Sequence, residues 1–234
     1  MSHSADESEP GVRQIRAIAW HRGPFKQKLG IPRQAGIHKE ISVVELDRSQ
    51  VGPACVDGLE AVSHLWITFG FSAHDSSKAS DSVRPPRLGG RARLGVFATR
   101  SPYRHNGLGL SLVEVCSVDF PEIRVRGADL LDGTPIYDIK PYLPWSEAPE
   151  GARCDWAPAP PQPVELRFSP EAEAQLRGRA DQDEVRQLLR NCLVVDPRPA
   201  YDREASEREF RTRIGPVDVS FRVEGQDLYV TQLK

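Results

Sequence analysis

The sequence predicts a mainly β protein with a small α+β domain at its C-terminal end. Between residues 110 and 144, apolar and polar residues alternate in several segments, which is the pattern of strands with one buried face. The 234 residues include 20 prolines and 18 glycines, and this content favours strands and loops over a helix bundle. After residue 169 the apolar spacing changes to that of amphipathic helices.

The first part of the chain contains strand patterns separated by polar segments. Residues 1–10, MSHSADESEP, are polar and acidic, and we expect them to be disordered. Strands are expected over residues 12–19 and 41–46. Residues 58–71 begin like a short helix and end in an apolar strand, and residues 72–83 read as a polar loop.

The strand pattern then continues to the end of the first domain. Residues 93–100 are a candidate short strand, and residues 110–120 and 122–131 alternate with period two. The DGTP turn at 132–135 leads into a further strand-like run at 136–144. Such a meander usually closes into a barrel or a sandwich.

The C-terminal part has a different composition and periodicity. Residues 147–163 are rich in proline and read as a linker. Ser169 is a suitable N-cap with Pro170 at the first helical position, and two helices and two or three strands follow. We therefore expect a barrel-like domain over residues 11–146, the linker over 147–163, and an α+β domain over 164–234.

Composition excludes several classes of protein. The formal net charge of −2 and the 39% hydrophobic content are those of an ordinary globular domain. No apolar run is long enough to span a bilayer, and the N-terminus lacks signal-peptide features, so a cytoplasmic protein is expected. The four cysteines are far apart and the histidines lack metal-ligand spacing, so neither disulfides nor a metal site is expected.

An arginine-rich segment at residues 84–109, RPPRLGGRARLGVFATRSPYRHNGLG, is the first candidate site. It holds six arginines and no acidic residue, and its glycines let a ligand approach the backbone closely. Phe97, Tyr103 and His105 offer rings that could stack on a base. A solvated basic surface is the plain alternative, and charge alone does not distinguish RNA from a small nucleotide ligand.

Three further loops are candidates with ordinary structural alternatives. LGIPRQAG at 29–36 offers the donors and acceptor of Arg33 and Gln34, or is a simple turn. The DGTP turn is a candidate site only if the strands on either side of it bring it to the same end of the domain as the other loops. DPRPAYDR at 196–203 presents Arg198, Tyr201 and Arg203, either to RNA or as a rigid interdomain loop.

Taken together, these blocks resemble the TsaA-like proteins known as TrmO. The resemblance rests on PRQAG, DGLEAVSHLWITFGF, RPPRLGGRARLGVFATRSPYRHNGLGLSLVEV, DLLDGTPIYDIKPYLP and DPRPAY. It spans roughly residues 15–144, and the DPRP block extends it into the tail. It implies a single-sheeted β-barrel, S-adenosylmethionine as methyl donor, and N6-methylation of threonylcarbamoyladenosine at tRNA position 37. It also implies a homodimer with the cofactor near the subunit contact, and a C-terminal domain that helps to engage tRNA.

The resemblance also implies site residues. The expected cofactor contacts are Pro32, Arg33, Gln34, Phe71, Ser72, Arg100, Leu110, Asp132, Gly133, Thr134 and Pro135. The expected substrate contacts are Arg87, Arg91, Tyr103, Arg198 and Tyr201. Arg100, Arg104 and Asn106 are candidate catalytic residues, the arginines because they could stabilise negative charge that develops on the substrate. No general base is identified.

One block departs from the family pattern, and this keeps alternatives open. The family commonly has two prolines after ATRS, whereas this chain has YRHNGLG at residues 103–109, which predicts a more mobile loop. The rival hypotheses are a regulatory barrel that binds a nucleotide-like ligand without turnover, an RNA-binding protein without a cofactor, and a methyltransferase for another RNA or a small molecule.

Overall fold

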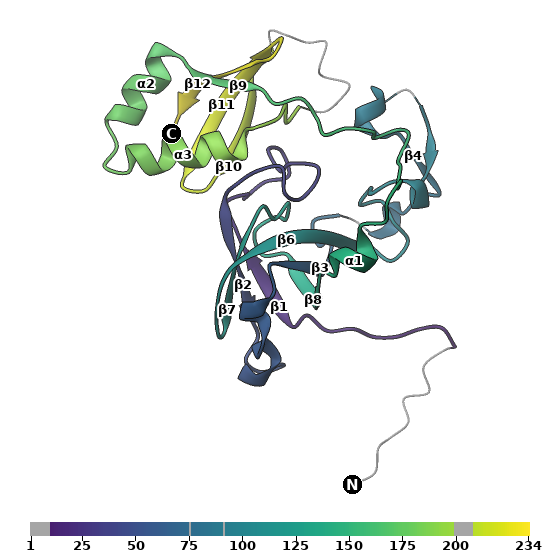
Figure 1. The fold of residues 1–234 in the computed structure, drawn as a ribbon. Coiled ribbons are helices and arrows are strands. Elements are labelled where there is room, and N and C mark those ends of the chain that lie inside the picture. The colour runs from purple at the N-terminus through teal and green to yellow at the C-terminus, as the bar shows by residue number, and fades with distance from the viewer. Residues whose placement is uncertain (1–9, 75, 91, 199–207) are drawn as a thin grey trace.

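The computed structural model describes residues 10–74, 76–90, 92–198 and 208–234 and shows a β-barrel joined to an α+β unit (Figure 1). We expected residues 1–10 to be disordered, and residues 1–9 lie outside the described ranges. The expected mainly β architecture with a barrel is confirmed.

Six strands form the closed barrel in the order β1-β2-β7-β6-β3-β8, and all its neighbours are antiparallel. Its interior is filled by alternate apolar side chains, among them Val44, Ile67, Val113 and Val125. The strands are β1 (Ala19–Arg22), β2 (Ile41–Leu46), β3 (His64–Gly70), β6 (Leu108–Asp119), β7 (Glu122–Arg126) and β8 (Pro135–Pro141).

Between β3 and β6 the chain makes a long excursion that includes the arginine-rich segment. A two-stranded ribbon forms there from β4 (Ser82–Val83) and β5 (Leu94–Gly95). The strand expected over 93–100 is therefore only two residues long. It ends because the chain turns into a 3-10 helix at Val96–Ala98. Other 3-10 turns are Pro53–Val56, Leu59–Ala61, Ser76–Lys78 and Pro86–Leu88.

Two predicted strands of the barrel are wrong in extent. The strand expected over 12–19 begins only at Ala19, because Val12 and Ile15 are exposed and the buried alternation falls on Ala19 and His21. The strand expected over 122–131 ends at Arg126. Gly127 has a φ of 80° there, and a Cβ on it would lie 3.0 Å from the backbone of residue 36.

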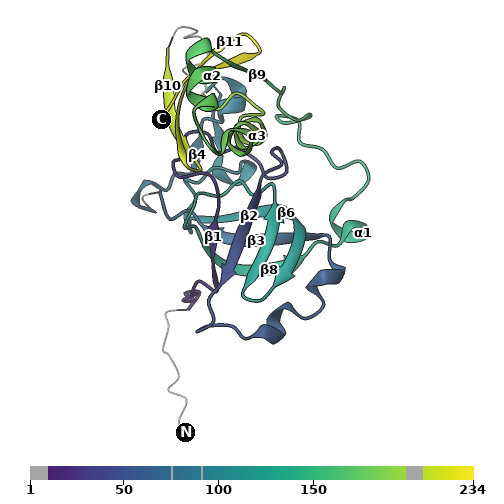
Figure 2. The same cartoon turned by 90° about the vertical axis from the view of Figure 1, so that its left-hand side faces the viewer.

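The antiparallel order determines where the loops lie. β1, β3 and β7 end at the rim where β2, β6 and β8 begin, so the connections 23–40, 71–107 and 127–134 all emerge from one end of the barrel. We call this the site end. It faces the C-terminal unit, whereas the 47–63 connection lies at the opposite end (Figures 1 and 2).

The C-terminal unit packs two helices, α2 (Pro170–Arg177) and α3 (Gln182–Cys192), against a sheet of order β10-β11-β12-β9. The Ser169 side chain accepts a hydrogen bond from the Ala172 amide, which confirms the predicted N-cap. The strands are β9 (Glu165–Phe168), β10 (Phe210–Ile214), β11 (Val217–Glu224) and β12 (Asp227–Leu233), and a short helix α1 (Pro144–Glu147) precedes the unit.

The barrel connection 23–40 is built into the core of the C-terminal unit. Phe25 is 0% exposed and lies within the C-terminal hydrophobic cluster, where it forms an isolated bridge with Ile214. Leu29 and Ile31 pack against the same cluster. The Gly215 amide also donates to the Pro24 carbonyl at 2.7 Å. The two units are therefore held together by a loop that carries predicted site residues.

Candidate functional site

Two of the predicted cofactor loops touch directly at the site end. Arg100 Nη1 donates a hydrogen bond to Gln34 Oε1 at 2.7 Å, joining the 71–107 connection to the 23–40 connection. Arg100 and Arg33 are exposed, and Pro32 between the loops is buried. The contact leaves guanidinium donors of Arg100 on an accessible surface, where an anionic ligand group could bind. The Gln34 amide nitrogen donates to the Arg33 carbonyl.

Arg33 links the same loop to the DPRP block of the C-terminal unit. Its Nη2 donates to the Arg198 carbonyl at 2.7 Å. The Arg198 guanidinium is only 4% exposed, and it pairs with the Asp196 carboxylate and donates to the Val223 carbonyl. The predicted substrate contact of Arg198 stays a prediction, and it would require this buried pair to open.

The DGTP turn braces the first loop from the other side. Asp132 Oδ1 accepts a hydrogen bond from the Gly23 amide at 3.0 Å, and Lys26 pairs with the same carboxylate at 2.8 Å. Burial acts to raise the pKa of Asp132, but these partners outweigh it and lower the pKa. Thr134 is buried and its hydroxyl donates to the Leu131 carbonyl, while Gly133 takes the positive φ that the turn needs.

His21 supports this turn from inside the barrel. Its Nδ1 lies 3.1 Å from the Leu131 carbonyl, and burial lowers the pKa of His21 to about 4, so the ring is neutral and donates this hydrogen bond. Nε2 is buried and has no partner in the described part of the chain. A Cβ at Gly23 would lie 2.3 Å from the ring, so Gly23 is required for close packing.

Aromatic side chains line the third side of the site end. Phe71 makes an edge contact with Phe69 at 5.1 Å between ring centroids, and His74 makes one with Tyr103 at the same separation. These rings border a small pocket of about 40 Å³. Its lining residues are Phe71, His74, Ala79, Pro102, Tyr103, Arg104 and Gly107. The pocket is far smaller than a typical ligand cavity of about 300 Å³ or more, so this pocket alone does not enclose a nucleoside.

The YRHNGLG loop is held by several contacts. Arg104 Nη1 donates to the Thr99 carbonyl at 2.7 Å, and His105 lies 3.1 Å from Asp81. Asn106 is exposed at the tip of the turn. Gly109 faces the barrel interior, where an added Cβ would lie 2.2 Å from the Phe69 ring, so no larger residue fits there without movement.

The remaining predicted residues lie around this region. Ser72 is exposed, and Leu110 projects outward from β6 with 53% of its surface exposed. Arg87 is exposed and donates to the Ala159 carbonyl of the proline-rich segment. The predictions for Arg91 and Tyr201 fall outside the described residues.

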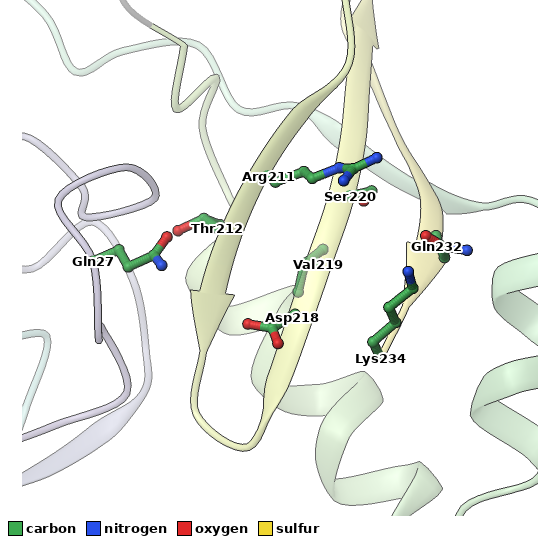
Figure 3. Close-up of a pocket in the computed structure, with 8 residues that line it drawn as sticks. All are labelled: Gln27, Arg211, Thr212, Asp218, Val219, Ser220, Gln232 and Lys234. Atoms are coloured by element: carbon green, nitrogen blue, oxygen red, sulfur yellow. The ribbon is translucent and has the colours of Figure 1, made fainter.

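A second pocket lies away from the site end. It has a volume of about 280 Å³ and lies on the C-terminal sheet (Figure 3). Its lining residues are Gln27, Arg211, Thr212, Asp218, Val219, Ser220, Gln232 and Lys234. None of the predicted site residues is among them.

The sequence analysis missed a serine–aspartate pair at the site end, in which Ser111 is buried and Asp129 is half-buried. The Ser111 hydroxyl donates a hydrogen bond to Asp129 Oδ1 at 2.5 Å. Ser111 is 3% exposed and lies opposite Ile67 of the neighbouring strand β3. Burial raises the pKa of Asp129 to about 6, although Ser111 and the Arg100 charge act to lower it. The only sequence signal was a serine at an inward position of a strand and a second aspartate just before DGTP.

Neither a metal site nor a membrane span is found in the described ranges. No group of three or more His, Cys, Asp or Glu side chains there could hold a metal ion. In the same residues no helix has the length and apolar content to cross a bilayer.

Comparison with known proteins identifies the family. The tRNA-methyltransferase O N-terminal domain matches residues 20–148, and the TrmO C-terminal domain matches residues 161–234. The chain belongs to the TrmO family. The resemblance drawn from the sequence blocks is thereby confirmed. A crystal structure of TrmO from P. aeruginosa superposes with a TM-score of 0.78 at 31% identity, covering 97% of this chain and 99% of that one.

Curated relatives in the TrmO family are named as methyltransferases. The Escherichia coli tRNA (adenine(37)-N6)-methyltransferase is 39% identical over 90% of this chain and 93% of its own length. A Pseudomonas aeruginosa protein named putative S-adenosylmethionine-dependent methyltransferase RcsF is 38% identical over 93% of this chain and 95% of its own length. The chain thus spans nearly the whole length of these relatives.

The raised pKa of Asp129 has a testable effect on stability. The pKa of Asp129 in the folded protein is about 6, above the ordinary value of 3.8. The fold therefore favours the protonated side chain, and this stabilisation is complete below pH 3.8 and is lost as the pH rises through 6. Asp129→Asn cannot ionise. We expect its free energy of unfolding, relative to the wild type, to rise by up to about 3 kcal/mol between pH 4 and pH 7.5.

Urea denaturation of both proteins at the two pH values measures this difference. Asp119→Asn is the control because it changes an exposed carboxylate at the opposite end of the barrel, and its effect should vary much less with pH. A difference between Asp129→Asn and wild type that is the same at both pH values would contradict the burial of this carboxylate.

Proposed function

We propose that this protein transfers a methyl group from S-adenosylmethionine to N6 of adenosine 37 in tRNA, and that the base carries a threonylcarbamoyl group. The observation that carries the proposal is the convergence of the three loops at the site end, with Arg100 bonded to Gln34. Membership in the TrmO family and the 39% identity to an adenine-37 methyltransferase support it.

The residues at the site end fit the chemistry of the methyl donor. S-adenosylmethionine has a carboxylate, an amino group, a sulfonium and an adenine, and when bound it supplies an electrophilic methyl carbon. Arg33 and Arg100 offer guanidinium donors for the carboxylate, and Gln34 offers both a donor and an acceptor. Phe71 and Leu110 offer apolar surface for the rest of the ligand.

The arginine-rich segment fits a modified nucleoside that carries negative charge. The threonyl group of the base ends in a carboxylate, and the anticodon arm around it carries phosphates, both of which arginines bind well. Arg87 comes from this segment, and Tyr103 adds a partly exposed ring on which a base can stack. We assign substrate binding to these residues and to the C-terminal unit.

The chain's contribution to catalysis is then positioning, charge stabilisation and exclusion of water. N6, the methyl carbon and the sulfur must lie nearly in line, at about 3 Å between the reacting atoms. N6 is bonded to a carbamoyl carbon, which delocalises its lone pair, so stabilising negative charge beside it accelerates attack. We assign this role to Arg100, while Arg104 holds the loop through the Thr99 carbonyl.

A homodimer in the cytoplasm completes the proposal. Phe97 is 81% exposed and Leu110 is 53% exposed, and both flank the site end, where a second subunit would cover them. The small volume of the pocket in one chain is consistent with a site that a partner helps to enclose. Light scattering on the full chain tests the dimer, and the mass of a single chain would contradict it.

Methyl transfer is tested directly with defined tRNA. Purified protein, S-adenosylmethionine and tRNA with threonylcarbamoyladenosine at position 37 should yield a nucleoside heavier by one methyl group, measured by mass spectrometry. The same tRNA without the threonylcarbamoyl group should remain unmodified.

Either of two results would contradict this assignment. No product from the modified tRNA, with the E. coli relative active in parallel, would favour a binding barrel without turnover. Equal methylation of both tRNAs would remove the threonylcarbamoyl group from the proposal.

The cofactor assignment is tested by replacing one arginine. Arg100→Ala removes a charge-assisted donor of about 1.5–3 kcal/mol, so S-adenosylmethionine should bind at least about tenfold more weakly in calorimetry. Arg93→Ala is the matched control, since Arg93 is an exposed arginine of the same segment. Equal affinity of the Arg100→Ala and Arg93→Ala variants would exclude Arg100 from the cofactor site.

A further inference from the structure

Asp129 occupies a position that its structural neighbours do not explain. It lies in the 127–134 connection, three residues before the DGTP turn, and one carboxylate oxygen accepts the Ser111 hydroxyl at 2.5 Å. Within the described residues no lysine or arginine forms a salt bridge with it. Asp132 in the same connection has Lys26 and the Gly23 amide as partners and holds the turn. Asp129 is therefore not needed for the same task.

The surroundings of Asp129 place it beside the proposed cofactor loops. Ser111 follows Leu110 on β6, and its side chain points into the barrel next to the rim. Arg100 is the charged group that acts on Asp129, and it bonds to Gln34 of the first loop. His38 lies nearby but its ring bonds to the Ala128 carbonyl. Asp129 thus lies beside Arg100, whose guanidinium bonds to Gln34 of the first loop.

A carboxylate in this place lowers stability, which favours a role in function. Burial raises the pKa of Asp129 to about 6, so the charged form present at neutral pH is disfavoured by the fold. An acid whose pKa lies near the working pH is well suited to accept a proton.

We propose that Asp129, held by Ser111, is the general base that accepts the N6 proton during methyl transfer. This inference rests on the proposed function. As N6 forms its bond to the methyl carbon, the carbon–sulfur bond breaks and its electron pair returns to sulfur, which becomes a neutral thioether. The N6 proton moves to the Asp129 carboxylate, so the positive charge of the sulfonium is cancelled by the loss of the carboxylate charge. Solvent then takes the proton from Asp129.

Ser111 is a positioning residue in this scheme. Its hydroxyl fixes Oδ1 of the carboxylate. In the proposal, Oδ2 accepts the N6 proton. Because the hydroxyl stabilises the charged form, its removal raises the pKa of Asp129. Replacing Asp129 should therefore lower kcat, whereas replacing Ser111 should shift the pH dependence of the reaction.

The test compares wild type, Asp129→Asn and Ser111→Ala on tRNA with threonylcarbamoyladenosine. For Asp129→Asn we expect kcat to fall about 100-fold or more, with the affinities for S-adenosylmethionine and tRNA in calorimetry within about threefold of wild type. For Ser111→Ala we expect kcat at high pH within a few-fold of wild type. The acidic limb of its kcat/KM profile should move to higher pH, because the base titrates later.

Each outcome decides between distinct accounts. A kcat for Asp129→Asn near the wild-type value overturns the inference, and so does an unmoved acidic limb in Ser111→Ala. Loss of S-adenosylmethionine affinity in Asp129→Asn, with kcat retained at saturation, would make Asp129 a cofactor ligand and also overturns it. Misfolding is excluded by thermal melting, in which Asp129→Asn should be at least as stable as wild type at pH 7.5. A wild-type protein without turnover overturns the proposed function and the base together.

Discussion

The antiparallel closure of the barrel is the constraint on which the site depends. Each pair of neighbouring strands runs in opposite directions, so the connections 23–40, 71–107 and 127–134 must leave from the same rim. Residues that are about 100 positions apart in sequence, such as Gln34 and Asp132, are thereby brought to one end, where bonds such as Lys26 to Asp132 join their loops. A rigid barrel wall with functional loops at one end is a common way to build a site, because the wall holds the loops in place.

The C-terminal unit adds a second constraint, because it holds the first of these loops. Phe25 is buried among residues of α2, α3 and the C-terminal sheet, and Arg33 donates to the backbone of Arg198. Asn191 of α3 also donates to Glu40 at 3.0 Å, near the end of the same loop. A movement of the C-terminal unit on binding tRNA would therefore be transmitted to the residues proposed to hold the methyl donor. Substrate binding and cofactor binding are physically connected through one loop.

The sequence predicted those elements whose signal is local. Residues 41–46 form β2 as expected, and burial alternates along all six residues, with Ser42, Val44 and Leu46 facing inward. Ser169 caps α2, since N-capping depends on residues within one turn. β1 was misplaced because one of its two inward residues, His21, is polar, and only the fold shows that this neutral ring is buried beside Gly23.

The site residues also differ in whether their sequence signal is local. The loops could be named from their motifs, and Gln34 and Arg100 do meet. Arg198 could not be assigned from sequence, because a buried ion pair with Asp196 and an exposed ligand contact use the same residue types. Asp129 and Ser111 escaped notice because neither belongs to a motif with a known spacing. Their pairing depends on the register of β6 in the barrel and on the end of β7 at Gly127, which are tertiary features.

Hydrogen exchange of the full chain, with and without S-adenosylmethionine, tests the central claim most directly. The convergence of the loops predicts slower exchange at amides in 32–36, 100–110 and 127–135 together, and unchanged exchange in the connections 47–63 and 120–121 at the opposite end of the barrel. Protection at that opposite end, or protection confined to the C-terminal unit, would show that the ligand binds elsewhere and would contradict the account.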